Sequence, residues 1–233
     1  MAERNASGEY VSLVIHELRN PLIGIDAAAR VLARDLGAHP AGRRAALVAE
    51  EARHLLDLLE SVTDAEAAAS GRLRSVLRSV DLAAVVRAAV EGAHLSEHEV
   101  RVRGVEGPVP VRADARRLRQ VLGNLLANAG QYSPAGSPID VTLSVDGRTR
   151  RATVEVRDRG PGIPAAQRRR LFRKFTRLTT ADGTRGSGLG LYISKAIADD
   201  HKGEISYRPA RGGGSAFSLR IPLRTRAAAA RSR

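Results

Sequence analysis

The sequence VSLVIHELRNPLIGIDAAARVLARDL at residues 11–36 decides the fold of the first part of the chain. Its apolar residues recur at alternating intervals of four and three, at Val11, Ile15, Leu18, Leu22, Ile25, Ala29, Leu32 and Leu36. This heptad spacing lines one face of an α-helix, so we predict a helix over about residues 10–36. Gly37 and Pro40 should end it, because glycine caps a helix C-terminus and proline resists continuing the helix.

A second apolar stripe follows through Val48, Ala52, Leu55, Leu59 and Val62. Two amphipathic helices joined by a short loop form an antiparallel hairpin. One hairpin alone buries only part of such long apolar faces, whereas two hairpins can pair into a four-helix bundle. We therefore expect a homodimer.

Beyond residue 70 the pattern becomes that of a mixed domain. We expect helices at about residues 81–93, 114–132 and 189–201, and strands at 99–105, 138–145, 151–157, 204–207 and 215–222. Asp146-Gly147 is a strong hairpin signal between two of these strands. The pattern predicts an α+β domain with helices on one face of a mostly antiparallel sheet.

The expected organisation is therefore a helical hairpin at residues 1–70, a linker at 71–79, a second domain at 80–223 and a basic, disordered tail at 224–233. The chain has no cysteine, which excludes disulfides, thiolate metal sites and cysteine nucleophiles. No apolar run approaches the roughly 18 residues that a membrane helix needs, and the N-terminus does not resemble a signal peptide. We expect a cytoplasmic protein without membrane insertion.

The net charge of +13 raises the alternative of a nucleic-acid partner. The cationic residues are nearly all arginine, because the only lysines are Lys174, Lys195 and Lys202. They are spread along the chain, and aromatic residues make up only 3% of it, so no interleaving of the kind that single-strand binders use is present. We therefore favour a solvated basic surface and expect no nucleic acid.

His16 directly follows Ile15 of the apolar stripe and should lie at the rim of the bundle face. Glu17 can accept a hydrogen bond from one ring nitrogen, which makes the other nitrogen a better nucleophile. Asn20 shares the helical face of His16, and Pro21 predicts a local bend beside it. A lone histidine on an amphipathic helix is most often a solvated surface residue.

Asn124 and Asn128 are spaced i, i+4 on one predicted helix and are followed by Gln131 and Tyr132. Two amide oxygens on one helical face can bind a hard Mg²⁺ ion that also holds phosphates. On spacing alone, a purely structural helix explains these residues equally well.

Asp158-Arg159-Gly160-Pro161-Gly162-Ile163 follows a predicted strand. A carboxylate beside glycines that allow close backbone approach suits hydrogen bonding to an adenine amino group, although a Gly-Pro-Gly turn is the simpler interpretation of this segment by itself. Further on, four glycines precede a predicted helix, at Gly183, Gly186, Gly188 and Gly190. Helix N-terminal amides attract phosphate oxygens and glycines permit a mobile lid, but one glycine-rich loop is weak evidence.

In chain order, these segments resemble the boxes of the sensor histidine kinases. The H box is HELRNPL at residues 16–22, and the N box is NLLANA at 124–129. The first G box is DRGPGI at 158–163, the F box is LFRKF at 171–175 and the second G box is GSGLGL at 186–191. Together the motifs extend over most of the chain in family order, which makes the resemblance highly specific.

The resemblance implies a dimerisation and phosphoacceptor hairpin followed by an α/β-sandwich ATP-binding domain of the Bergerat type. His16 would accept a phosphoryl group from ATP, with Glu17 as its acid/base partner. Asn20 would help place the γ-phosphate, or a water molecule when the protein acts as a phosphatase. The expected partner is the receiver domain of a response regulator, whose aspartate takes the phosphoryl group from His16.

The resemblance also assigns the nucleotide site. Asn128 would be the principal Mg²⁺ ligand with Asn124 assisting, Tyr132 would pack on the adenine and Asp158 would read its amino group. Phe172 and Phe175 would anchor the lid. The remaining expected nucleotide-binding positions are Gln131, Gly160, Gly162, Ile163, Gly186, Gly188, Leu189 and Gly190.

The chain departs from the family pattern at two positions. Gln131 stands where a phosphate-binding lysine is usual, and Arg173, Lys174, Arg177 and Arg185 are open candidates to replace it. Lys202 stands where glycine is usual. Because fewer than twenty residues precede His16, we expect the sensor module to lie on a separate protein or to have been removed from this chain.

Three alternatives remain at this point. A degraded kinase could keep the dimer and bind nucleotide as a scaffold. Gln131 is the only support for this alternative, and the intact His16, Glu17, Asn128 and Asp158 argue against it. A related ATPase or serine kinase would share the nucleotide fold but would need no H box on a heptad helix. A DNA-binding protein would show steeply salt-dependent binding.

Overall fold

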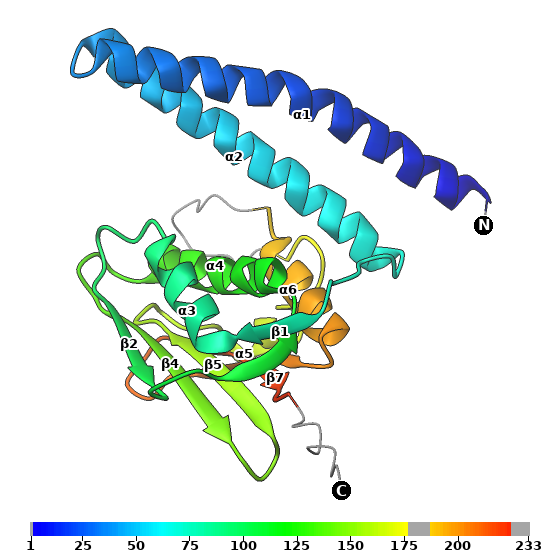
Figure 1. The fold of residues 1–233 in the computed structure, drawn as a ribbon, viewed down its shortest axis with the longest axis vertical. Coiled ribbons are helices and arrows are strands. Elements are labelled where there is room, and N and C mark those ends of the chain that lie inside the picture. The colour runs from blue at the N-terminus through cyan, green and yellow to red at the C-terminus, as the bar shows by residue number, and fades with distance from the viewer. Residues whose placement is uncertain (1, 177–186, 225–233) are drawn as a thin grey trace, which may run out of the picture. The chain divides into compact units, whose positions relative to one another are not determined.

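The computed structural model describes residues 2–176 and 187–224, and for residues 2–14 and 16 it describes the backbone alone. Contacts divide the chain into two compact units, Met1–Arg72 and Leu73–Arg233 (Figure 1). Each unit has its own architecture, and each is described by itself.

The first unit is a helical hairpin of α1 (Ala2–Leu36) and α2 (Pro40–Ala69). Helix α1 begins before the predicted residue 10 and continues through Pro21. Gly37 has a φ of +49° in the connection, a conformation that glycine adopts without strain. His39 then starts α2, because its Nδ1 accepts a hydrogen bond from the amide of Ala41 at 3.1 Å.

Small residues fill the contact between the two helices. The buried apolar side chains of the hairpin are Ile15, Ala29, Ala49, Ala52 and Ala65. Larger residues of the predicted stripe, among them Ile25, Leu32 and Leu55, remain about half exposed. Among its described residues, the hairpin therefore uses alanines for its internal contact and leaves larger apolar side chains exposed.

The second unit is an α+β domain, as the sequence pattern predicts. Its helices are α3 (Leu82–Glu91), α4 (Ala115–Tyr132), α5 (Ala165–Arg168) and α6 (Gly190–Asp200). Its strands are β1 (Arg78–Asp81), β2 (Val100–Gly104), β3 (Pro110–Ala113), β4 (Ile139–Asp146), β5 (Arg151–Arg157), β6 (Glu204–Pro209) and β7 (Ser215–Pro222). The sequence pattern did not predict β1, β3 or α5, each only four residues long.

The main sheet has the strand order β2-β4-β5-β7-β6, in which only the β2–β4 pair is parallel. Strands β1 and β3 form a separate antiparallel ribbon. Helices α3, α4 and α6 cover one face of the sheet (Figure 1). Burial alternates residue by residue along β5, so one face of the sheet packs against these helices to form the core.

The stretch that leads into β1 is fixed to the second unit. Leu73 is buried, and the amides of Ser75 and Val76 donate to Asp200 at 2.7 Å and to Asp114 at 3.1 Å. Residues 73–76, which lie in the expected linker, are therefore held by two carboxylates at the ends of α6 and α4.

His201 makes hydrogen bonds at both the start of α4 and the C-terminal end of α6. Its Nε2 accepts from the amide of Asp114 at 3.0 Å, and its Nδ1 lies 2.8 Å from the carbonyl oxygen of Ile197. An amide can only donate and a carbonyl can only accept, so the proton of this buried imidazole resides on Nδ1. Burial alone raises the pKa of Asp114, but hydrogen bonds from the amides of Val76, Arg117 and Arg116 outweigh it and lower the pKa below its ordinary value.

Asp114→Ala should destabilise the second unit by about 1–2 kcal/mol, because it removes the N-cap of α4 together with the acceptor for Val76. Urea denaturation at neutral pH measures this loss. The pKa of Asp114 is lower in the folded state than in the unfolded state. Ionised Asp114 therefore stabilises the fold fully at a pH above its unfolded-state pKa, and this stabilisation disappears as the pH falls through its folded-state pKa. The difference between wild type and variant should therefore shrink in acid, and a difference independent of pH would contradict this assignment.

Candidate nucleotide-binding site

Helix α4 carries the centre of the site on its polar face. Its opposite face is fully buried through Leu118, Leu122, Leu125 and Leu126, which fixes the rotation of the helix. Asn124 and Asn128 are both half-buried and share the remaining face. The core packing thereby presents two amides side by side, as the spacing in the sequence predicts.

Asn124 connects α4 to the start of α6. Its Nδ2 donates to the carbonyl oxygen of Gly190 at 3.2 Å and to Oγ of Ser194 at 3.3 Å. Because the carbonyl of Gly190 can only accept, the NH₂ group of Asn124 must face it. The amide oxygen of Asn124 is thereby left as an acceptor for another ligand.

The side-chain amide of Asn128 makes no hydrogen bond within the described part of the chain. Two amide oxygens combined with phosphate oxygens form the hard donor set that Mg²⁺ prefers. Among the described residues there is no group of three histidine, cysteine, aspartate or glutamate residues that could hold a metal ion by itself. The side chains of α4 therefore fit a cation whose remaining ligands come from a phosphate-bearing molecule.

Asp158 follows β5 and is 4% exposed. Its Oδ1 accepts hydrogen bonds from the amides of Gly160 at 2.9 Å and Ser215 at 2.8 Å. Its second carboxylate oxygen has no hydrogen bond to any described residue. The carboxylate is thus anchored through one oxygen and can accept from a ligand through the other.

The loop after Asp158 lies against the C-terminal end of α4. A Cβ added at Gly160 would lie 2.6 Å from the carbonyl oxygen of Tyr132, so only glycine fits without a shift. Gly162 has a φ of +74°, and its missing Cβ faces the carbonyl oxygen of Gly214. These contacts explain why glycines occupy both positions, and they bring Tyr132, itself half-buried, beside the loop.

Tyr207 on β6 supports this loop, a role that no motif in the sequence predicts. Its hydroxyl accepts from the amide of Ile163 at 3.1 Å, while its ring packs on Phe217 with a centroid separation of 5.3 Å. Arg168 lies over the same ring and donates to the carbonyl of Ile163 at 2.9 Å. No local signal in the sequence connects Tyr207 to Ile163, because the two residues are 44 positions apart.

The F box and the start of α6 meet through their backbones. Phe175 has a φ of +56°, and a Cβ at Gly188 would lie 2.9 Å from its carbonyl carbon. Phe172 is half-buried, whereas the side chain of Phe175 is 71% exposed. The role of these two residues as anchors of a lid remains a prediction.

Several other predicted residues can be placed. Leu189 is buried directly before α6, whereas Gln131 is exposed on α4. Gly183 and Gly186 lie outside the described residues, as do Arg177 and Arg185. Lys174, a candidate to replace the missing family lysine, lies with its Nζ 5.4 Å from the centre of the Tyr192 ring.

In the first unit, the backbone of His16 lies within α1, but its side chain is outside the described part. Ile15 beside it is buried, and Glu17 and Asn20 are exposed. Helix α1 therefore exposes Glu17 and Asn20 on either side of its buried Ile15 stripe, while the predicted place of the His16 side chain at the rim of a bundle stays a prediction.

Comparisons with known proteins show the family of the chain. Residues 113–225 match the family described as histidine kinase-, DNA gyrase B- and HSP90-like ATPases. The signal transduction histidine-protein kinase AfsQ2 of Streptomyces coelicolor is 35% identical over 93% of this chain, which spans 42% of that protein. The sensor protein CreC of Escherichia coli is 32% identical over 94% of the chain, which spans 46% of its length.

Among solved structures, the mycobacterial sensor histidine kinase MprB is 31% identical, with a TM-score of 0.57. The match covers 64% of this chain and all of that one. Full-length ShkA in complex with AMPPNP has a TM-score of 0.74 and 28% identity, over 94% of this chain and 47% of that one. The chain therefore belongs to the sensor histidine kinase family. It spans less than half of the first curated relatives that it matches.

No helix in the described residues is both long enough and apolar enough to cross a membrane.

Proposed function

We propose that this chain is the catalytic core of a two-component histidine kinase, which phosphorylates His16 from Mg·ATP and passes the phosphoryl group to an aspartate of a response regulator. One observation carries the nucleotide-binding part of this proposal. Helix α4 contacts the second G box through Asn124 and Gly190, and it contacts the first G box through Tyr132 and Gly160. Helix α4 thus brings together the candidate metal ligands, the carboxylate proposed to read the adenine and the helix start proposed to bind the phosphates.

In the proposed nucleotide complex, Asp158 accepts a hydrogen bond from the adenine amino group through its unused carboxylate oxygen, and Tyr132 covers the ring. The amides at the start of α6 face the phosphates, since helix N-termini favour anions. Asn128 and Asn124 hold Mg²⁺, which neutralises charge on the phosphates when bound. Gly162, Ile163, Gly188 and Leu189 shape the loops around the nucleotide.

The proposed transfer uses the hairpin. A nitrogen of His16 attacks the γ-phosphorus, an N–P bond forms and the P–O bond to ADP breaks. Glu17 holds and receives the proton of the other ring nitrogen, which keeps the attacking nitrogen nucleophilic. Asn20, four residues further along the same helix face, positions the γ-phosphate, or a water molecule when the same site dephosphorylates the response regulator.

We further propose that the working form is a homodimer. The half-exposed apolar residues of the hairpin recur at heptad spacing, for example at Ile25 and Leu32, and together they form a surface that two hairpins can bury in a four-helix bundle. The family relationship supports the same assembly. The sensor module is proposed to lie in a part of the protein beyond this chain, because the chain spans less than half of the first curated relatives that it matches.

Incubation with γ-labelled ATP and Mg²⁺ should yield label that is acid-labile and alkali-stable, as phosphohistidine is. His16→Gln should abolish this label, because it removes the nucleophile. His54→Gln is the matched control, since His54 is an exposed histidine of the same hairpin, and it should retain full labelling. Equal labelling of the His16→Gln variant would disprove the proposed acceptor.

Asp158→Asn should weaken AMPPNP binding by roughly a hundredfold, because a donor NH₂ would replace the acceptor oxygen that faces the adenine. Asparagine retains one oxygen for the amides of Gly160 and Ser215, so the loop should stay folded. Titration calorimetry measures the affinity, and thermal unfolding checks the fold. Glu155→Gln, on the partly exposed ion pair with Arg208, is a control that should bind normally. Normal binding by the Asp158→Asn variant would count against an adenine-reading role.

Ile25→Asp combined with Leu32→Asp should convert the dimer to a monomer, because two carboxylates would have to be buried in the bundle. Sedimentation velocity distinguishes the two states. Arg44→Asp, an exposed change on the same hairpin, should leave the dimer intact. A wild-type chain that is monomeric at all accessible concentrations would refute the proposed assembly.

A further inference from the structure

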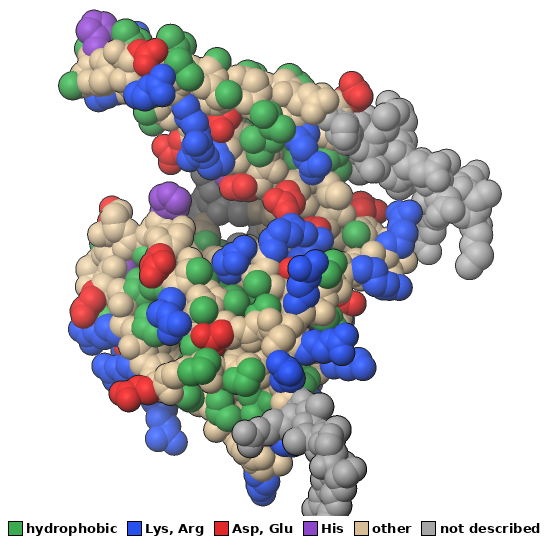
Figure 2. All heavy atoms as spheres, viewed as in Figure 1, with side chains coloured by type: hydrophobic (Ala, Val, Ile, Leu, Met, Phe, Trp, Pro, Cys, Tyr) green, Lys and Arg blue, Asp and Glu red, His purple; other side chains and the backbone are tan. Residues whose placement is uncertain are grey.

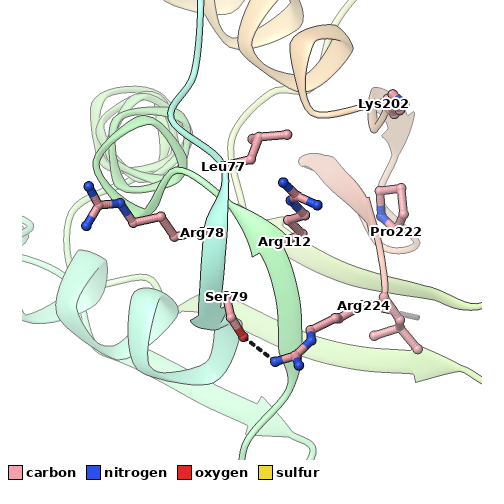
Figure 3. A pocket seen from close by; sticks show the side chains of 8 residues that line it. Leu77, Arg78, Ser79, Arg112, Lys202, Pro222 and Arg224 are labelled. Atoms are coloured by element: carbon pink, nitrogen blue, oxygen red, sulfur yellow. Dashed lines mark hydrogen bonds between the residues drawn. The ribbon is translucent and has the colours of Figure 1, made fainter. Parts of the chain in front are cut away.

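A cavity of about 760 Å³ lies on the second unit, beside the β1–β3 ribbon and the end of β7 (Figure 3). This volume falls within the range of small-molecule sites. Its lining includes the cationic side chains of Arg112, Lys202 and Arg224, with apolar surface from Leu77 and Pro222. None of its lining residues belongs to the candidate nucleotide site.

The pleat of the ribbon explains which side chains face the cavity. Ser79 lies directly opposite Arg112 in the β1–β3 register, so both side chains lie on the same face of the ribbon. Arg78 is the preceding residue, and its guanidinium points away from Arg112 (Figure 3). Arg224 is held by a hydrogen bond from its Nη1 to Oγ of Ser79 at 2.8 Å. The ribbon therefore places Arg112 on the same face as Ser79, which in turn holds Arg224, and Arg78 also lines the cavity.

The cationic side chains of this cavity are not engaged in ion pairs with the described part of the chain. Within the described residues, neither Arg112, Lys202 nor Arg224 forms a salt bridge. Elsewhere in the unit, arginines do pair with acids, as Arg159 does with Asp140 at 2.6 Å. Like charges around a hollow raise the local positive potential, which a bound anion would lower.

Lys202 adds an independent observation. It has a φ of +54° and occupies the position after the C-cap of α6. Its backbone amide donates to the carbonyl oxygen of Asp199 at 2.9 Å, and the amide of Gly203 donates to the carbonyl oxygen of Ala198 at 2.8 Å. This Schellman arrangement favours glycine, because a side chain in the left-handed region is strained. Lys202 therefore lines the cavity from a backbone conformation that disfavours any side chain, which motivates assigning a role to its ammonium group.

We propose that this cavity binds a small molecule bearing two or more phosphate groups. Guanidinium groups match phosphate oxygens with forked hydrogen bonds, and the lysine ammonium adds a compact third charge. Leu77 and Pro222 offer apolar surface to the carbon part of the ligand. The proposal does not depend on kinase activity, because it concerns residues that the nucleotide site does not use.

The decisive variant is Lys202→Gly, because it should raise the midpoint of thermal unfolding by relieving backbone strain while it weakens anion binding. Tripolyphosphate is titrated calorimetrically in magnesium-free, EDTA-containing buffer against the full chain. The dissociation constant should rise about tenfold in Lys202→Gly and in Arg112→Ala, since each loses one charge-assisted contact. Asn128→Ala, in the nucleotide site, should leave the affinity unchanged. So should the double variant Arg103→Ala/Arg148→Ala, which removes two exposed arginines elsewhere on the unit.

Three outcomes would overturn the proposal. The first is no binding of tripolyphosphate to the wild type. The second is equal weakening by the Arg103→Ala/Arg148→Ala control, which would mean that only net charge matters. The third is binding to vesicles of phosphatidylglycerol in phosphatidylcholine without binding to tripolyphosphate, which would assign the phosphate chemistry to a lipid surface instead of a soluble molecule. A Lys202→Gly variant that is more stable but binds tripolyphosphate less tightly would support the proposal and exclude misfolding as the cause.

Discussion

The packing of helix α4 is the constraint on which the second unit depends. Four leucines, buried to 1% exposure or less, fix its rotation, and Asp114 fixes its start. Once this rotation is set, Asn124 must face the first turn of α6, and the carbonyl of Tyr132 must lie against Gly160. The polar groups of the site are therefore placed by hydrophobic burial on the far side of the same helix. Ordinary helix geometry thus lets one face of α4 fix the rotation of the helix while the other face presents Asn124 and Asn128.

Two aspartates illustrate how backbone amides determine what a carboxylate can do. Asp114 uses one oxygen for the amides of Arg116 and Arg117 and the other for Val76, so both oxygens serve the fold. Asp158 uses a single oxygen for Gly160 and Ser215, which orients the group while leaving an acceptor for a ligand. Both residues follow a strand and precede a turn or helix. The distribution of the amides over the two oxygens, and not the residue type, therefore distinguishes Asp114 from Asp158.

The sequence could predict those features that repeat locally. Heptad spacing predicted the hairpin, and Asp146-Gly147 predicted the β4–β5 connection within a few residues. It could not predict β1 and β3, because a ribbon of four-residue strands has too little periodicity and exists only through pairing across about thirty residues. The support of Ile163 by Tyr207 and the docking of Ser75 on Asp200 likewise depend on long-range contacts. The motifs could be recognised from their order, whereas the side chains that hold them in place required the tertiary structure.

Helix α6 connects the candidate nucleotide site at its first residue with the cationic cavity at its C-terminal cap. Its first residue, Gly190, accepts a hydrogen bond from Asn124, and its C-terminal cap carries His201 and Lys202. The helix is only eleven residues long, so it is short enough to behave as a rigid rod. His201 fastens the C-terminal end to Asp114, and Asp200 fastens it to Ser75. A displacement of α6 along its axis would therefore disturb Asn124, the start of α4 and the stretch leading into β1 together. Strain at Lys202 is tolerated because the hydrogen bonds of its neighbours fix this end of the helix independently of the lysine side chain.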